Sequence, residues 1–422
     1  MAALPETDAR AAPFFGRRVV WAAFGLAALG WGVGFYGPPV YLHAVIARTG
    51  WSLEFVSGMV TVHFVFGALV VANLPALYGR FGLPAVTSVG SLALAVGVLG
   101  WSLAAQPWQL GLAALLTGAG WVTMGAAALN AIVSPWFVRT RSAALSTAYN
   151  GASIGGVVFS PLWAALIAKL SFPAAAAIVG VATVCIVWTM SGLVFSRTPG
   201  DLGQSPDGDA PGSPASPLAS TGARPLPGRL LWRDRTFLTL AAGMALGLFA
   251  QIGLIAHLYS VLVPVVGGQV AGFAMALATA CAIAGRIVVG RAMPVGAARR
   301  LVSCLAYGVQ LAGSLVLLAA GGNVALLVLG IVLFGSGIGN ATSLPPLIAQ
   351  QEFAKEDVQR VVSTVVATGQ ATYAFAPAAF GLLRVFAPEA LALAPDSVAP
   401  LFAAAAVIQA LAILMFLLGR NP

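Results

Sequence analysis

The chain has 422 residues, of which 59% are hydrophobic and only 8% are charged, and its mean hydropathy is +0.94. Soluble domains carry about 25% charged residues, so this composition excludes an ordinary soluble protein. The formal net charge of +9 would fit nucleic-acid binding, but the basic residues are distributed as in a membrane protein, which argues against that function. The three cysteines lie inside apolar runs without the spacing of a metal site, and no metal or cofactor is predicted.

Apolar runs of about 20 residues, the length of a helix that crosses a bilayer, recur from Val19 nearly to the C-terminus. A β-barrel would instead show alternating segments of about ten residues. The sequence therefore predicts an all-α integral membrane protein with twelve spans, at residues 19–44, 55–78, 84–104, 107–133, 142–168, 172–195, 236–263, 270–293, 299–320, 323–349, 361–386 and 397–418.

Residues 196–235, between the sixth and seventh spans, are dense in Pro, Gly and Ser, which indicates a solvated linker. The linker separates two six-helix bundles, at residues 19–195 and 236–418. An N-terminal segment, 1–18, and a short tail, 419–422, lie outside the bundles.

The two halves resemble each other in order, which predicts two pseudo-symmetric bundles related by a parallel duplication. Gly118-Ala-Gly120 in the fourth span has a counterpart in Gly335-Ser-Gly337 in the tenth. The first and seventh spans each carry a histidine near the end away from the linker, His43 and His257. Each match alone would be expected by chance in a glycine-rich chain, so the order of the matches carries the inference.

Lysine and arginine set the predicted orientation. Seventeen of the 21 fall on the side of both termini and the linker, whereas the opposite side holds only Arg48, Lys169 and Arg384. By the positive-inside rule, both termini and the linker are predicted to be cytoplasmic. The expected location is a cell inner (plasma) membrane, crossed many times, with the protein as a monomer.

The remaining basic residue, Arg286, lies in AIAGRIVVGR (282–291), inside a predicted span. All twelve acidic residues fall in predicted loops, the linker or the termini, so no carboxylate partner is expected at the depth of Arg286. An arginine at a helix centre costs about 2.5–3.5 kcal/mol on insertion scales. A small anion that pairs with the guanidinium fork, such as a carboxylate, would offset that cost. Alternatively, Arg286 lies only about 10 Å inside its span and snorkels to the interface or bonds a carbonyl.

Histidine titrates near physiological pH, so His257 and His63 are candidates for proton coupling, and His43 is a weaker one. The alternative is a neutral imidazole that bonds a backbone carbonyl or water. Four further polar residues inside spans are candidates for substrate binding, although such residues more often join helices to each other: Tyr36, Asn130, Gln370 and Tyr373.

Four stretches carry a resemblance to a known family: YGPPVYLHAVIARTGWS (36–52), PWFVRTRSAALSTAYNGASIGG (135–156), RTPGDLGQSPDGD (197–209) and GRIVVGR (285–291). Across nearly the whole chain, the sequence resembles the major facilitator superfamily. Within it, these stretches are similar to bacterial relatives of the monocarboxylate transporters and oxalate/formate exchangers.

The resemblance implies roles for individual residues. The family's carboxylate-binding arginine falls on Arg286, and a histidine found in some members falls on His257, which would then also contact substrate. The basic residue that some members place in the middle of the eleventh span is absent, so a single cation favours a monoanion over a dianion.

The resemblance also predicts a cytoplasmic gate at Arg80 and Gly82, and the positive-inside count places Arg291 at the cytoplasmic rim. The loop PALYGRFG (75–82) keeps Arg80 and Gly82 but has Pro75 and Gly79 where the family places Gly and Asp. The usual latch at this loop is therefore weakened.

No nucleophile–base set, P-loop or dinucleotide fingerprint is present, so an enzyme is not predicted. The sequence predicts a secondary transporter that carries a small organic anion, a monocarboxylate, by alternating access, with proton coupling or exchange. The partners expected are this anion, the bilayer and protons. The alternatives are an exporter of a hydrophobic compound, in which Arg286 is structural, and a substrate-sensing membrane receptor.

Overall fold

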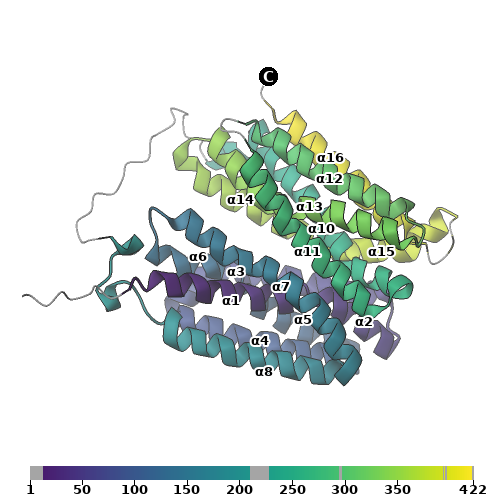
Figure 1. Cartoon of the computed structure of the whole chain (residues 1–422), viewed down its shortest axis with the longest axis horizontal. Coiled ribbons are helices and arrows are strands. Elements are labelled where there is room, and N and C mark those ends of the chain that lie inside the picture. The colour runs from purple at the N-terminus through teal and green to yellow at the C-terminus, as the bar shows by residue number, and fades with distance from the viewer. Residues whose placement is uncertain (1–12, 210–227, 294–296, 393, 395–396, 421–422) are drawn as a thin grey trace, which may run out of the picture.

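The computed structural model describes residues 13–209, 228–293, 297–392, 394 and 397–420. These residues form helices, turns and loops, without a strand. Figure 1 shows two helix bundles, one from each half of the chain. The all-α fold with two bundles is as predicted.

The helices of the first bundle are α1 (Gly16–Gly34), α2 (Pro38–Thr49), α3 (Leu53–Phe81), α4 (Leu83–Leu103), α5 (Pro107–Val122), α6 (Ala126–Val133), α7 (Arg141–Leu170) and α8 (Phe172–Met190). After the short helix α9 (Gly228–Leu231), the helices of the second bundle are α10 (Arg235–Val266), α11 (Gly268–Ala292), α12 (Arg299–Ala319), α13 (Val324–Glu352), α14 (Lys355–Tyr373), α15 (Ala376–Ala390) and α16 (Ala399–Leu418).

Eleven helical segments of the described chain are long and apolar enough to cross a membrane. The predicted eleventh span is the exception, because it is divided into α14 and α15 at Ala374–Phe375. Pro377 in the first turn of α15 has no N–H and cannot continue a helix from α14. Two further spans are broken, between α1 and α2 at residues 35–37 and between α5 and α6 at residues 123–125. None of these breaks was predicted.

The paired glycines of the two halves occupy equivalent places. A Cβ on Gly118 would lie 2.2 Å from a backbone oxygen of α3, and one on Gly120 would lie 2.5 Å from a backbone oxygen of α4. In the second bundle, a Cβ on Gly335 would lie 2.5 Å from a backbone oxygen of α11, and one on Gly337 equally far from one of α12. Small residues permit such close helix contacts. The shared pattern agrees with the predicted pseudo-symmetry.

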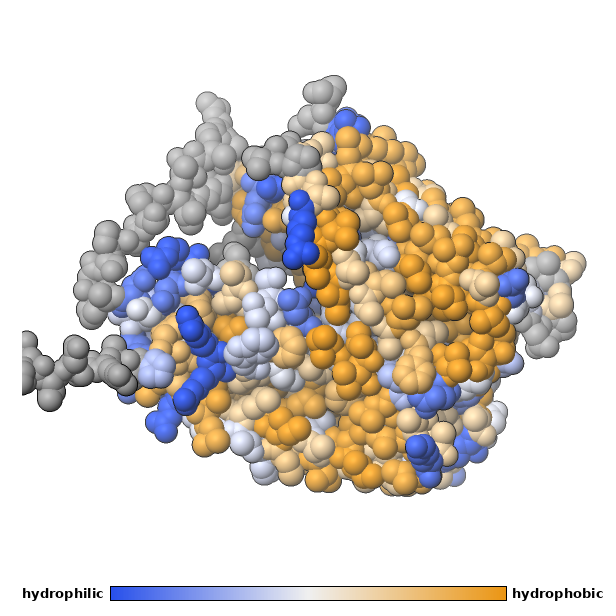
Figure 2. Space-filling view, in the orientation of Figure 1, coloured by the Kyte–Doolittle hydropathy of each residue, from blue (hydrophilic) through white to orange (hydrophobic). Residues whose placement is uncertain are grey.

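The two bundles contact each other mainly through three helix pairs: α2 with α10, α3 with α15, and α7 with α11. The outer helices α4, α8, α12 and α16 pack chiefly within their own bundle. In Figure 1 the bundles lie close together at the end that carries α2, here called the far end, and diverge toward the end that carries the linker, here called the linker end. Figure 2 shows the surface hollowed between the bundles at the linker end.

The first part of the predicted linker, residues 197–209, is solvent-accessible and is joined to the first bundle by hydrogen bonds. The Asp207 carboxylate accepts hydrogen bonds from the backbone N–H groups of Val138, Arg139 and Thr140, at 2.8 to 3.1 Å, and from the Thr140 hydroxyl. Asp209 forms an ion pair with Arg139 at 2.9 Å. Asp207 therefore caps the N–H groups of the three residues that lead into α7, where Thr140 itself makes no side-chain cap. Residues 210–227 of the linker lie outside the described residues.

The Asp207 cap gives a pH-dependent contribution to stability. Desolvation would raise the pKa of Asp207, but the hydrogen bonds from residues 138–140 outweigh it and lower the pKa to about 2. The stabilisation is thus present above the unfolded-state pKa of about 4 and is lost as pH falls toward about 2. Asp207→Asn is expected to lower stability at pH 7 by about 1 kcal/mol, as for a lost helix cap. Thermal unfolding in detergent at pH 7 and pH 3 measures this, and an unchanged difference between the two proteins at both values would contradict it.

Candidate functional site

Arg286 lies in the half of α11 nearer the linker end, and its side chain is partly buried. Its Nε donates a hydrogen bond to the Gly339 carbonyl of α13 at 3.0 Å. The ion pairs found among the described residues are Arg139 with Asp209, Arg300 with Glu352 and Arg360 with Asp357, so none involves Arg286. A guanidinium has five N–H donors, and the carbonyl bond uses one of them. The proposed carbonyl alternative therefore accounts for only part of its hydrogen-bonding capacity.

Close packing of α13 on α11 positions this carbonyl. A Cβ on Gly339 would lie 2.1 Å from the Ala282 carbonyl oxygen and 3.2 Å from Cβ of Arg286. A Cβ on Gly285 would lie 1.9 Å from the Ser336 carbonyl oxygen. Because glycines allow the two helices to touch, the base of the Arg286 side chain is held against α13.

Tyr36 of the first bundle lies near Thr279 of the second, which is on the same helix as Arg286. Thr279 lies two turns before Arg286 on the same face of α11. A Cβ on Gly156 of α7 would lie 2.7 Å from both Tyr36 and Thr279, so three helical segments meet at this point. The structure thus places Tyr36 about two helical turns from Arg286, where the bundles meet.

An aromatic cluster adjoins Tyr36, and we call it the aromatic wall: Phe35, Tyr36, Phe64, Trp121 and Tyr373. The Phe35 ring lies 5.1 Å from Tyr36, 6.0 Å from Phe64 and 6.1 Å from Trp121. Tyr373 of α14 reaches across from the second bundle to Phe64, at 5.8 Å. Phe35, Phe64 and Trp121 were not among the predicted site residues. Phe35 lies in the break between α1 and α2, Phe64 in α3 and Trp121 in α5. No sequence pattern connects these three positions.

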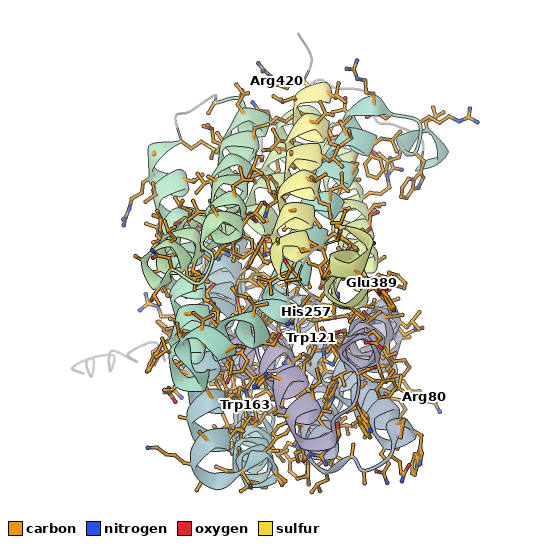
Figure 3. All side chains as sticks on the ribbon, turned by 90° about the vertical axis from the view of Figure 1, so that its right-hand side faces the viewer. Arg80, Trp121, Trp163, His257, Glu389 and Arg420 are labelled. Atoms are coloured by element: carbon orange, nitrogen blue, oxygen red, sulfur yellow. The ribbon has the colours of Figure 1, made fainter. Side chains whose placement is uncertain are left out.

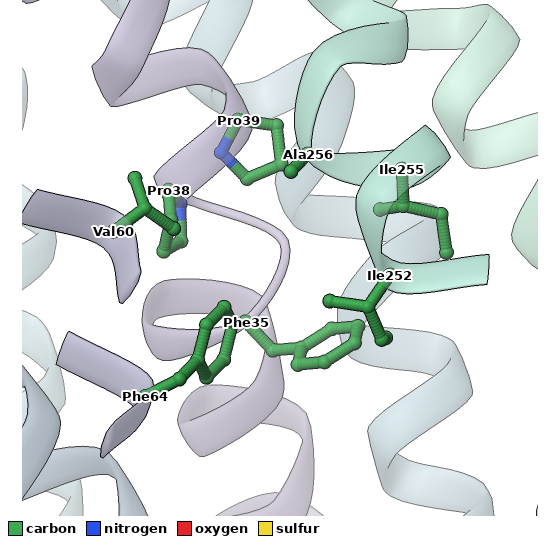
Figure 4. Close-up of a pocket in the computed structure, with 8 residues that line it drawn as sticks. All are labelled: Phe35, Pro38, Pro39, Val60, Phe64, Ile252, Ile255 and Ala256. Atoms are coloured by element: carbon green, nitrogen blue, oxygen red, sulfur yellow. The ribbon is translucent and has the colours of Figure 1, made fainter. Parts of the chain in front are cut away.

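Carbon atoms line a small pocket that adjoins the wall (Figure 4). Its residues come from the break between α1 and α2, from the start of α2, from α3 and from α10, so it lies between the two bundles. They are Phe35, Pro38, Pro39, Val60, Phe64, Ile252, Ile255 and Ala256. The contact between the bundles is therefore apolar at this level.

Two other predicted binding residues lie apart from these contacts. Gln370 is partly buried one turn before Tyr373 on α14. Asn130 of α6 is exposed, and its amide donates to the Tyr149 hydroxyl at 2.8 Å and to the Ala126 carbonyl at 3.0 Å. The Asn130 amide thus joins helices within the first bundle.

His257 is fully buried in α10, and its Nε2 lies 2.9 Å from the Pro377 carbonyl at the start of α15. Figure 3, which views the far end, shows His257 and Trp121 where the two bundles meet. His257 lies nine residues from the far end of α10, and Arg286 lies 18 residues from the far end of α11. At 1.5 Å per residue these depths are about 14 and 27 Å, so the structure does not bring His257 to Arg286.

The other histidines are also engaged. His63 is buried in α3, its Nδ1 lies 2.9 Å from the Thr117 hydroxyl, and its ring stacks on Trp121. The His43 ring packs against Tyr259 at the far end, 5.6 Å between centroids. Within the described parts of the chain, no group of three His, Cys, Asp or Glu side chains is placed to hold a metal ion.

Arg384 corrects the prediction that Arg286 is the only charge within a span. It was counted with the far-side loops, but it is partly buried within α15 and donates to the Ser260 hydroxyl of α10 at 2.7 Å. The prediction that every acid lies in a loop, the linker or a terminus is also wrong, because five lie in the end turns of helices: Glu54, Glu352, Glu356, Asp357 and Glu389. Of the other acids, Glu6, Asp8 and Asp396 lie outside the described residues.

The predicted gate residues lie at the linker end. Arg80 is exposed in the last turn of α3, with its guanidinium over the Phe81 ring at 5.1 Å. Gly82 links α3 to α4 with a φ of +79°, which favours glycine. Arg291 is exposed in the last turn of α11.

Comparisons with known proteins agree with this architecture. A bacterial homologue of the human lysosomal transporter Spinster, solved in an inward-facing, unoccupied conformation, matches with a TM-score of 0.65 and 15% identity, over 97% of this chain and 99% of that one. The nucleoside transporter NupG matches with a TM-score of 0.69 and 11% identity, over 96% and 100% of the two chains. At these identities the likeness concerns the fold alone.

Sequence comparison gives the family. No curated protein sequence matches the chain. The family model described as Major Facilitator Superfamily matches residues 20–377, which is most of the chain. The protein is therefore a multi-pass membrane transporter that belongs to the Major Facilitator Superfamily.

Proposed function

We propose that the protein is a secondary transporter that carries a small organic anion, a monocarboxylate, by alternating access. The observation that supports this most directly is Arg286. It lies on α11, which contacts α7 of the opposite bundle, and forms no ion pair among the described residues. A partly buried guanidinium with free donors favours an anion that binds two of its N–H groups at once.

We place the linker and both termini in the cytoplasm of a cell bounded by its inner membrane, on the positive-inside distribution of the sequence. The far end then faces the outside, where the bundles touch, and the hollow at the linker end opens to the cytoplasm. On this orientation the conformation is inward-facing, and the anion reaches Arg286 from the cytoplasm.

For coupling, we favour exchange of one anion for another over proton symport. Exchange requires no proton carrier, whereas symport would use a histidine near the substrate. His257 is buried against the Pro377 carbonyl, and His63 is held between Thr117 and Trp121. Neither ring is positioned beside Arg286.

A thermal-shift screen of the purified protein tests the anion site. Acetate, pyruvate, oxalate, cyanate and nitrate are compared with neutral amides of similar size. Monocarboxylates are expected to stabilise the protein, and Arg286→Lys to reduce the shift, because an ammonium lacks the planar fork. Stabilisation by neutral hydrophobic compounds alone, equal in both proteins, would instead support the exporter in which Arg286 is structural.

A further inference from the structure

The surroundings of Arg286 restrict what can be attached to the carboxylate. On one side lies the α13 backbone, whose Gly339 carbonyl already accepts from Nε. Toward the far end, the ring of Tyr36 lies beside Thr279 of α11. Beyond Tyr36 the polar groups give way to the aromatic wall, which begins at Phe35, the next residue in the chain.

The aromatic wall is formed by both bundles. Phe35, Tyr36, Phe64 and Trp121 come from the first bundle, and Tyr373 comes from the second. Phe35 and Tyr373 are only partly buried, so their rings retain surface that a ligand can cover. The adjoining pocket in Figure 4 extends the carbon surface toward Ile252 and Ile255. Aromatic rings pack favourably against other rings and against aliphatic groups.

Arg384 does not offer a second cation to a small ligand bound at Arg286. It is partly buried in α15 of the second bundle and is bonded to Ser260. It lies six residues from the end of α15, and Arg286 lies 18 residues from the far end of α11. At 1.5 Å per residue the two differ in depth by about 18 Å, more than a small dicarboxylate spans.

We infer that the transported anion is a monocarboxylate with an apolar body, aromatic or branched. Its carboxylate pairs with Arg286, and its body packs against Phe35 and Tyr373 of the aromatic wall. This inference rests on the proposed function and adds the class of substrate to it. It also makes Phe35 and Tyr373 the residues that determine specificity.

The test measures the affinity of the purified protein for benzoate, cyclohexanecarboxylate, acetate, malonate and neutral benzamide by isothermal titration calorimetry. Benzoate and cyclohexanecarboxylate are expected to bind at least about tenfold more tightly than acetate, because they bury more apolar surface. Malonate and benzamide are expected to bind more weakly than benzoate, since one adds an unpaired charge and the other lacks a charge.

Variants separate the two ends of the ligand. Phe35→Leu keeps an apolar side chain but removes the ring, and is expected to weaken benzoate binding about fivefold to tenfold while leaving acetate unchanged. Phe273→Ala on α11, where Phe273 is 57% exposed, is the matched control and should alter neither. Arg286→Ala should abolish binding of both acids.

The outcomes distinguish failure of the apolar-body inference from failure of the proposed anion transport. Equal affinity for acetate and benzoate, both dependent on Arg286, would overturn the apolar-body inference and leave the anion transporter intact. If Phe35→Leu weakened the binding of acetate and of benzoate by the same factor, the role of Phe35 in specificity would be overturned. Binding of benzamide as tight as that of benzoate, unchanged in Arg286→Ala, would overturn the proposed function itself.

Discussion

Arg286→Ala is expected to reduce uptake of the transported anion into proteoliposomes about 100-fold or more. A charge-assisted hydrogen bond is worth roughly 1.5–3 kcal/mol, and the guanidinium fork supplies two. Since 1.4 kcal/mol is a factor of ten, losing the pair removes at least two orders of magnitude. Without ligand, Arg286→Ala should unfold at the same temperature as the unmodified protein or at a higher one. The substitution removes a charge that forms no ion pair among the described residues, and such a charge is costly at membrane depth.

Arg291→Ala is the matched control for this experiment. Arg291 lies five residues later on the same helix, but it is exposed in the last turn at the linker end. Its loss should leave the affinity for the anion unchanged. Transport by Arg286→Ala at the rate of the unmodified protein would show that Arg286 is structural.

Gly381→Trp is expected to prevent closure of the far end and to abolish transport while binding persists. A Cβ on Gly381 of α15 would already lie 2.7 Å from Oγ and 2.8 Å from Cβ of Ser57 on α3. An indole there cannot fit between the two bundles in the observed conformation. The substitution should destabilise the conformation in which the far end is closed. The variant should therefore populate the conformation in which the far end is open.

Distance measurements between spin labels test this shift. Ala47 at the end of α2 and Glu389 on α15 are both exposed, at the far end of opposite bundles, and serve as labelling sites after replacement of the three cysteines. The distance should increase in Gly381→Trp. Gly58→Trp is the control, because it is next to Ser57 on α3 but a Cβ there meets no atom within 4 Å. An unchanged distance in Gly381→Trp would show that the bundles separate elsewhere.

The spans were predictable because each needs about 20 apolar residues, and this requirement is local. The breaks within them were not, because tertiary contacts satisfy the freed backbone groups. The Tyr41 hydroxyl, for example, donates to the Val33 carbonyl at 3.0 Å, across the break between α1 and α2. Likewise, the composition of residues 197–209 indicated a solvated segment, but Asp207 finds its partners at residues 138–140, far away in the sequence.

Part of the site was predictable from charge alone. Arg286 was identified because a cation inside an apolar span requires an explanation, and that signal is local. Tyr36 and Tyr373 were predicted as polar residues at suitable depth. Phe35 and Phe64 could not be, since apolar rings are ordinary in any membrane span and only the packing of separate spans makes them a surface. The closeness of Thr279 to Tyr36 was missed for the same reason, because the two residues belong to different bundles.

The paired glycines indicate which bundle holds the carboxylate of the substrate. Gly118 packs on His63 and Gly335 packs on Ala278 in the same way, so the two bundles are in matching register at these positions. The residue eight positions after Ala278 is Arg286, and the residue eight positions after His63 is Val71. Val71 is therefore the counterpart of Arg286 in the first bundle. The cation and the carbonyl that it bonds both belong to the second bundle. During a rocking motion the bound carboxylate would move together with the second bundle. Most of the aromatic wall belongs to the first bundle and would move relative to the carboxylate.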